Sequence, residues 1–82
     1  MTPKQAEAVD TLLDLFRQSR NSPEAARGFV GMALVMAKKD ILDYLIAGLL
    51  KQAQSLNILP TKSLLFRDMA FEIERKQNER TI

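Results

Sequence analysis

Three prolines divide this sequence into helical segments. Pro3 and Pro23 each follow a hydroxyl side chain, Thr2 or Ser22, and each precedes a run in which apolar residues recur every three or four positions. Proline suits the first helical position, where its missing N–H has no intrahelical partner, and the preceding hydroxyl can accept a hydrogen bond from a free amide of the first turn. Pro3 and Pro23 therefore predict helix starts, whereas Pro60 predicts the end of a helix.

The spacing of apolar residues predicts four helices and an all-α fold. Residues at i, i+3, i+4 and i+7 share one face of a helix, and such a face is normally buried against other helices. We expect a small antiparallel four-helix bundle-like domain over residues 1–76, which associates as a dimer, and a frayed polar tail over 77–82. The expected helices span 3–20, 23–38, 40–56 and a fourth segment capped by Thr61 or Ser63.

The same spacing predicts which side chains form the core. The segment 23–38 is apolar almost all round; Phe29 and Met36 mark its expected buried face, and only a narrow polar stripe is expected to reach solvent. Its two glycines, Gly28 and Gly31, are expected to allow close approach of a neighbouring helix. The expected core positions of the other segments are Val9, Leu12, Leu13 and Phe16; Ile41, Leu42, Leu45, Ile46, Leu49, Leu50, Ala53 and Leu56; and Phe66, Met69, Ala70 and Ile73.

The second and third segments could form one continuous helix, because no glycine or proline separates Lys38, Lys39 and Asp40. On a common helical wheel, however, their apolar faces lie roughly 150° apart. One straight helix would therefore turn its apolar face almost to the opposite side. Lysines at the end of one helix and an aspartate at the start of the next also suit the two helix dipoles. We favour two helices joined by a tight turn.

The composition excludes several kinds of chemistry. The chain has 82 residues with no histidine, cysteine or tryptophan, so a zinc finger, a disulfide framework, a thiol nucleophile and an imidazole base are impossible. Carboxylates one turn apart, such as Asp10 with Asp14, are typical of a solvated helix face. We therefore expect no enzymatic activity, no cofactor, no metal and no small-molecule substrate.

Hydrophobic residues are more abundant than four short helices need. They make up 46% of the chain and concentrate in the segments 23–38 and 40–56. This excess indicates a non-enzymatic protein–protein interaction module, such as an adaptor, chaperone, inhibitor or small regulator, that acts through a hydrophobic helical surface as a homodimer or with another protein. A compact monomer that uses these residues in its core is the plainer interpretation. The candidate interface residues are Met32, Leu64, Arg67 and Phe71.

A DNA-binding regulator is the alternative function. Residues 53–58 resemble the turn of a helix-turn-helix, with Asn57 at the position that tolerates a left-handed conformation. The following helix also carries Asp68, Glu72 and Glu74, which phosphates repel, and the net charge of the chain is only +2. The candidate nucleic-acid contacts are Lys62, Arg67, Arg75 and Lys76.

We expect a cytoplasmic protein without a membrane span. The start of the sequence is polar, unlike a secretory signal. The longest uncharged runs, 28–37 and 44–50, are far shorter than the roughly 20 apolar residues that a bilayer helix needs. A basic belt within residues 17–39 is a weaker argument for membrane-surface binding, because its cations share no face with an apolar stripe.

Overall fold

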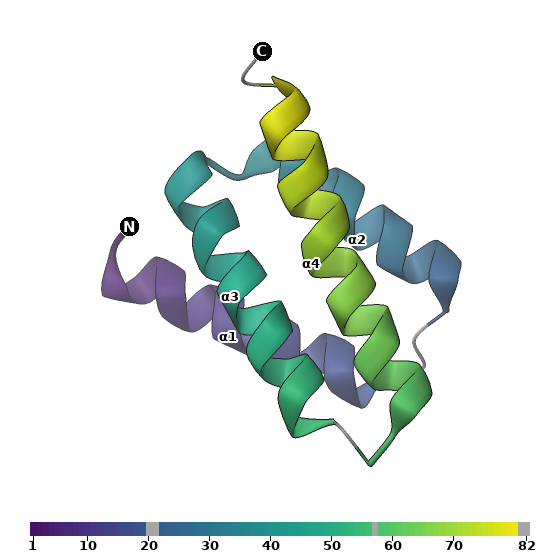
Figure 1. Ribbon diagram of the computed structural model, residues 1–82. Coiled ribbons are helices and arrows are strands. Elements are labelled where there is room, and N and C mark those ends of the chain that lie inside the picture. Colours follow the sequence, from purple (N-terminus) through teal and green to yellow (C-terminus); the bar gives the residue numbers. More distant parts are fainter. Residues whose placement is uncertain (20–21, 57, 81–82) are drawn as a thin grey trace.

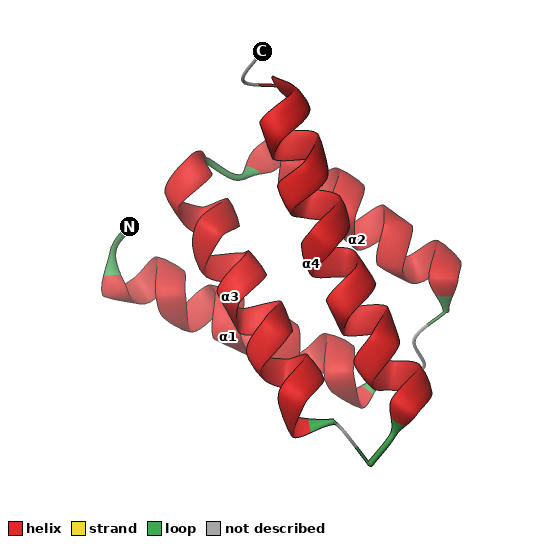
Figure 2. Ribbon diagram, in the orientation of Figure 1, coloured by secondary structure: helices red, strands yellow, loops and turns green. Residues whose placement is uncertain are grey.

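The computed structural model describes residues 1–19, 22–56 and 58–80. Figure 2 shows that this part of the chain is helical, with short connections and no strand. The predicted all-α class with four helices is therefore confirmed. The helices are α1 (Pro3–Gln18), α2 (Pro23–Met36), α3 (Lys39–Ser55) and α4 (Pro60–Arg80).

The four helices form two layers (Figure 1). In the front layer, α3 and α4 lie side by side, run in opposite directions and contact each other more extensively than any other pair of helices. Behind them, α1 packs on α3 and α2 packs on α4. The α3–α4 pair therefore has neighbours on its rear side, whereas α1 and α2 each lie at the edge of the helical packing.

Apolar side chains from all four helices meet between the layers. Phe66 and Ile73 of α4 and Leu49 of α3 have no exposed surface, and the buried residues include no charged or polar side chain among those described. All four core positions predicted for α4 are buried. The core consists of Val9, Leu13, Ala26, Val30, Leu34, Leu42, Leu45, Leu49, Ala53, Leu56, Phe66, Met69, Ala70 and Ile73.

Phe16 joins three helices at one end of the core. Its ring centroid lies 5.2 Å from that of Phe29 on α2 and 5.7 Å from that of Phe66 on α4. The contact with Phe66 is edge-to-face, the arrangement favoured by the negative face and positive edge of aromatic rings. One side chain of α1 thus fixes the positions of both α2 and α4.

The helix starts follow the predicted capping chemistry at two of three positions. Thr2 and Gln5 form a reciprocal capping box, and the Ser22 hydroxyl accepts a hydrogen bond from the Ala25 amide at 3.1 Å. The prediction that Thr61 or Ser63 caps the last helix is wrong, since α4 already begins at Pro60. The Ser63 hydroxyl instead donates to the Ala53 carbonyl at 2.8 Å and links α4 to α3.

The break between the second and third helices is confirmed. Ala37 and Lys38 are extended, with ψ angles of 142° and 167°, so α2 ends at Met36 and α3 begins at Lys39. The helix boundaries elsewhere differ by only a few residues. At the other end of the chain, α4 continues through residues 77–80, where the sequence predicts a frayed tail; residues 81 and 82 lie outside the described part.

Two predicted core residues are exposed instead. Leu12 on α1 is 52% exposed and Met36 on α2 is 77% exposed. The second helix buries only the stripe of Ala26, Val30 and Leu34, because α2 packs on one helix of the front layer and has no layer behind it. The predicted polar stripe of Arg27, Gly31 and Lys38 is exposed, but the prediction that only this stripe reaches solvent is wrong, because a broad and mainly apolar face of α2 is exposed as well.

The glycine that permits close helix packing is Gly48, which the sequence did not single out. A Cβ added at Gly48 would lie 2.6 Å from Cδ1 of the buried Leu13, so α1 approaches α3 more closely than an alanine would allow. The prediction that Gly28 and Gly31 serve this purpose within the chain is wrong. A Cβ added at either position would meet no atom within 4 Å.

We expect alanine to have opposite effects at two of these glycines. Gly31→Ala fills open space and gains helix propensity, which raises the free energy of unfolding by about 0.5–1 kcal/mol. Gly48→Ala forces Leu13 to move within a close-packed core, which costs about 1–3 kcal/mol and outweighs the same gain. Urea unfolding followed by circular dichroism measures both. Equal stabilisation by the two substitutions would contradict the close α1–α3 contact.

The two phenylalanines of α4 offer a test of the core. Phe66→Ala empties a fully buried site, so we expect the free energy of unfolding to fall by about 3–5 kcal/mol. Phe71→Ala, on the exposed face of the same helix, is expected to change it by less than about 1 kcal/mol. Both variants are measured by urea unfolding at low protein concentration. Similar losses at the two positions would show that Phe71 belongs to the core.

Candidate interaction surface

Opposite its buried stripe, α2 exposes an uncharged face, and the exposed Glu24 and Arg27 lie beside that face. At about 100° per residue, five positions lie opposite the buried stripe of Ala26, Val30 and Leu34. Three of them carry large apolar side chains that are mostly in solvent: Met32 is 65% exposed, Val35 82% and Met36 77%. We call this surface the outer face of α2; it comprises Ala25, Gly28, Met32, Val35 and Met36.

α1 exposes two apolar side chains of its own. Leu12 is 52% exposed and Leu15 is 59% exposed, and both lie off the buried positions Val9 and Leu13. α1 and α2 both lie behind the α3–α4 pair (Figure 1). Large exposed apolar patches on small proteins commonly mark binding surfaces.

The four predicted interface residues do not lie together. Leu64, Arg67 and Phe71 share the outward face of α4, where Leu64 is 54% exposed and Phe71 is 53% exposed. Met32 belongs to the rear layer, on the face of α2 directed away from α4. The structure thus divides the set into a larger apolar surface around Met32 and a smaller one around Phe71. The sequence did not single out Val35, although its spacing from Met32 was a usable signal.

Three of the four cations predicted to contact nucleic acid, Lys62, Arg75 and Lys76, lie against other groups of this chain. The Lys62 ammonium donates a hydrogen bond to the Arg17 carbonyl at the C-terminal end of α1. Arg75 forms ion pairs with Glu72 and Glu79, both at 2.8 Å. The hydrogen bond to Glu72, together with the two negative charges, raises the pKa of the Arg75 guanidinium.

The other two predicted cations, Lys76 and Arg67, differ in their surroundings. Lys76 lies 4.0 Å from Glu72, which already pairs with Arg75. Arg67 is exposed and forms no ion pair with the described residues. In addition, α3 and α4 lie side by side along their lengths (Figure 1), whereas the two helices of a helix-turn-helix cross at about 90–120°. Asn57, the predicted turn residue, lies outside the described part of the chain.

Polar side chains of α1 bind to α3. The Tyr44 hydroxyl donates to the Asp10 carboxylate, at 2.9 Å and 3.0 Å from its two oxygens. Farther along the same two helices, Gln52 of α3 accepts a hydrogen bond from the Arg17 guanidinium at 2.8 Å and donates one to Asp14 at 3.2 Å. The two aspartates predicted to be a solvated pair are exposed, and both help to attach α1 to α3.

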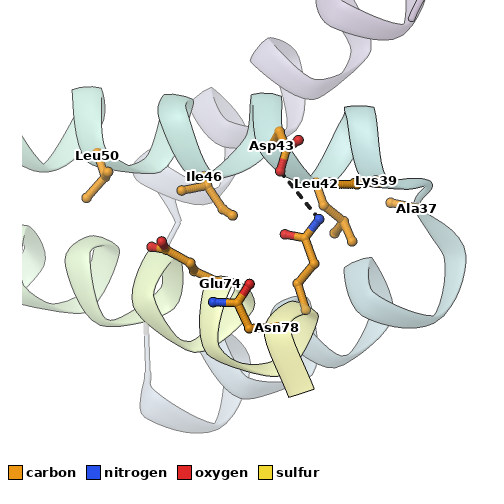
Figure 3. A pocket seen from close by; sticks show the side chains of 9 residues that line it. Ala37, Lys39, Leu42, Asp43, Ile46, Leu50, Glu74 and Asn78 are labelled. Carbon is orange, nitrogen blue, oxygen red and sulfur yellow. Dashed lines mark hydrogen bonds between the residues drawn. The ribbon is translucent and has the colours of Figure 1, made fainter. Parts of the chain in front are cut away.

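A groove separates the ends of α3 and α4 that lie near the α2–α3 turn (Figure 3). Ile46 and Leu50 point from α3 toward α4, and Glu74 and Asn78 point from α4 into the same space. Gln77 bridges the groove by donating to the Asp43 carboxylate at 3.4 Å. The volume of the groove is about 760 Å³, and it is lined by apolar side chains together with Lys39, two carboxylates and two amides.

The described residues contain no group of three acidic side chains that could hold a metal ion. Within the same part of the chain, no helix is long and apolar enough to cross a membrane. Comparisons with protein-family models, with curated proteins and with solved structures found no match for this chain.

The single tyrosine allows a direct test of the contact between α1 and α3. The hydrogen bond to Asp10 raises the pKa of Tyr44, with smaller contributions from partial desolvation and from the charge of Asp10. We expect the ultraviolet titration of the folded protein to have a midpoint above the usual value of about 10, and Asp10→Asn to lower it toward that value. Tyrosine absorbance reports this group alone, because the chain has one tyrosine and no tryptophan.

Asp14→Asn is the matched control for this titration, since Asp14 bonds to Gln52 and not to Tyr44. It should leave the midpoint close to that of the unchanged protein. Because the folded pKa of Tyr44 lies above the unfolded one, the stabilisation from this bond is complete below pH 10 and is lost as the pH rises through the folded pKa. An identical midpoint in the folded protein and in urea would contradict the Tyr44–Asp10 bond.

Proposed function

We propose that this chain is a small, non-enzymatic protein–protein interaction module that binds its partner through the outer face of α2. The observation that carries the proposal is the exposure of Met32, Val35 and Met36 on one uncharged helix face. In this proposal an antiparallel bundle holds α2 in place, and the module acts by occupying a surface. An adaptor, a chaperone, an inhibitor and a small regulator can all act in this way.

The energetics of the face suit a binding surface. Burying one exposed methionine, valine or leucine removes on the order of 100 Å² of apolar surface from water, which contributes about 2–3 kcal/mol. The three large side chains of α2 together reach the same order as the cost of association, about 4–15 kcal/mol, before the partner's own side chains are counted. Methionine is flexible and polarizable, so Met32 and Met36 can adapt to the surface that covers them.

Leu64, Arg67 and Phe71 form a second, smaller candidate surface on α4. Its two apolar side chains are separated by charged neighbours, Arg67 and Asp68 among them, so it contains less continuous apolar area than the outer face of α2. Lys62, Arg75 and Lys76 contact other groups of this chain, so the alternative of DNA binding depends largely on Arg67. No feature of the described helices favours DNA over a protein as the partner.

Site-specific photo-crosslinking in living cells tests the proposed function. A benzophenone side chain at position 35 should form covalent adducts with a protein, whichever protein that is, because it lies at the centre of the proposed surface. The same group at position 71 tests the smaller surface on α4. Adducts are detected by gel shift and identified by mass spectrometry.

The control places the benzophenone at Lys51, an exposed polar position on α3. We expect adducts from position 35 to exceed those from position 51 by at least about tenfold, the ratio that corresponds to a specific contact of modest strength. Equal labelling from the two positions, or none from position 35, would overturn the proposed role of the outer face of α2.

A further inference from the structure

We propose that the partner of the outer face of α2 is a second copy of this chain, with the two α2 helices packed antiparallel across a two-fold axis near Met32. The inference rests on the proposed function and specifies its partner. In this arrangement Gly28 of one copy, four positions before Met32, faces Met36 of the other copy, four positions after Met32. Other positions pair in the same way. Three properties of the face favour this arrangement.

The first property is the distribution of charge at the two ends of α2. Glu24 lies at the N-terminal end of the face, and Lys38 and Lys39 follow its C-terminal end. None of the three forms an ion pair with another described residue. Antiparallel packing about Met32 places Glu24, eight positions before the axis, next to residues 38–40 of the other copy. Asp40, which lies directly opposite by position, pairs with the N-terminal ammonium at 2.8 Å, so the two lysines are the charges left for Glu24. The two helix dipoles also oppose each other favourably. Parallel packing would instead place like charges together.

The second property is the shape of the face. Gly28 lies four positions before Met32, and Met36 lies four positions after it. A Cβ at Gly28 would meet no atom within 4 Å, so this glycine leaves open space above the helix backbone. Across the two-fold axis, Met36 of each copy lies over Gly28 of the other, as a knob fits into a hole. A glycine inside a helix lowers the stability by about 0.5–1 kcal/mol relative to alanine. Packing of Met36 against Gly28 of the other copy would explain why a glycine occupies this position.

The third property is the apolar area. Met32, Val35 and Met36 expose together on the order of 350 Å² of apolar surface per copy, so a symmetric dimer buries about 700 Å² from these side chains alone, before Ala25, Gly28 and the flanking residues are counted. Weak, transient interfaces bury less than about 1,200 Å², so an interface of this size corresponds to a dimer of modest affinity. The outer face contains no charged residue, so two copies can meet without burying an unpaired charge.

Sedimentation equilibrium on the full chain tests the dimer, and charge reversal tests its orientation. Glu24→Lys should weaken dimerisation about threefold to tenfold, because it replaces two attractive contacts by two repulsive ones. The double substitution Lys38→Glu with Lys39→Glu should weaken it to a similar extent. Combining all three substitutions restores the opposite charges with reversed sign, so the dissociation constant should return to within about twofold of the original. Circular dichroism checks that each variant is folded.

Cysteine crosslinking provides an independent measurement of the register, since the chain contains no native cysteine. Met32→Cys should form a disulfide with its own copy, and Phe71→Cys should not. A mixture of Gly28→Cys and Met36→Cys chains should form mixed disulfides at least about fivefold faster than either chain forms them with itself, because a disulfide requires Cα atoms within about 7 Å.

The outcomes separate this inference from the proposed function. A monomer at every attainable concentration would overturn the inference, yet adducts from position 35 with a different protein would leave the proposed function intact. A dimer whose charge reversals do not rescue each other, or whose mixed 28–36 disulfides form no faster than self-links, would overturn the antiparallel α2 contact. A dimer with rescue and with the predicted disulfides would support it.

Discussion

The packing of α3 against α4 is the interaction on which the other helices depend. Leu49 on α3 and Phe66 and Ile73 on α4 are completely buried, and the two helices share more contacts than any other pair. Each of the rear helices packs chiefly on one member of this pair: α1 on α3 and α2 on α4. Loss of the α3–α4 contact would therefore remove the surface on which both α1 and α2 are buried.

The attachment of α1 uses several polar groups that the sequence offered as candidates for function. Asp10 accepts a hydrogen bond from Tyr44, the Arg17 guanidinium binds Gln52, and the Arg17 carbonyl accepts a hydrogen bond from Lys62. The candidate acid–base groups and one candidate phosphate contact thus serve to hold helices together. These polar side chains of α1 and α3, with Lys62 of α4, contribute to the packing of the helices.

The two-layer arrangement explains why the outer face of α2 exists. A helix that is apolar nearly all round needs neighbours on several sides, and α2 has a front layer but nothing behind it. Its buried stripe of Ala26, Val30 and Leu34 consists of small and medium side chains, while the larger Met32 and Met36 lie in solvent. A second copy placed on this face would supply the missing layer and complete the burial that the composition of the helix implies.

Local patterns in the sequence determined the number of helices, two of their capping sites and the buried stripe of α4. These features depend on neighbours within a turn or two: the hydroxyls before Pro3 and Pro23 satisfy nearby amides, and Phe66, Met69, Ala70 and Ile73 are the main apolar line on an otherwise charged helix. The break at Ala37–Lys38 also followed from the phase of the apolar residues.

Only the tertiary structure decided which face of the second helix is buried, and with it the candidate site. Periodicity selects a face when polar residues mark the other side, but a helix that is apolar all round has no preferred phase, so Met36 could not be distinguished from Val30. The close approach at Gly48 and the internal use of Lys62 were equally inaccessible, because each depends on a residue more than thirty positions away in the sequence. Apolar residues in a sequence determine how much surface a chain can bury; the packing of its helices determines which of them remain for a partner.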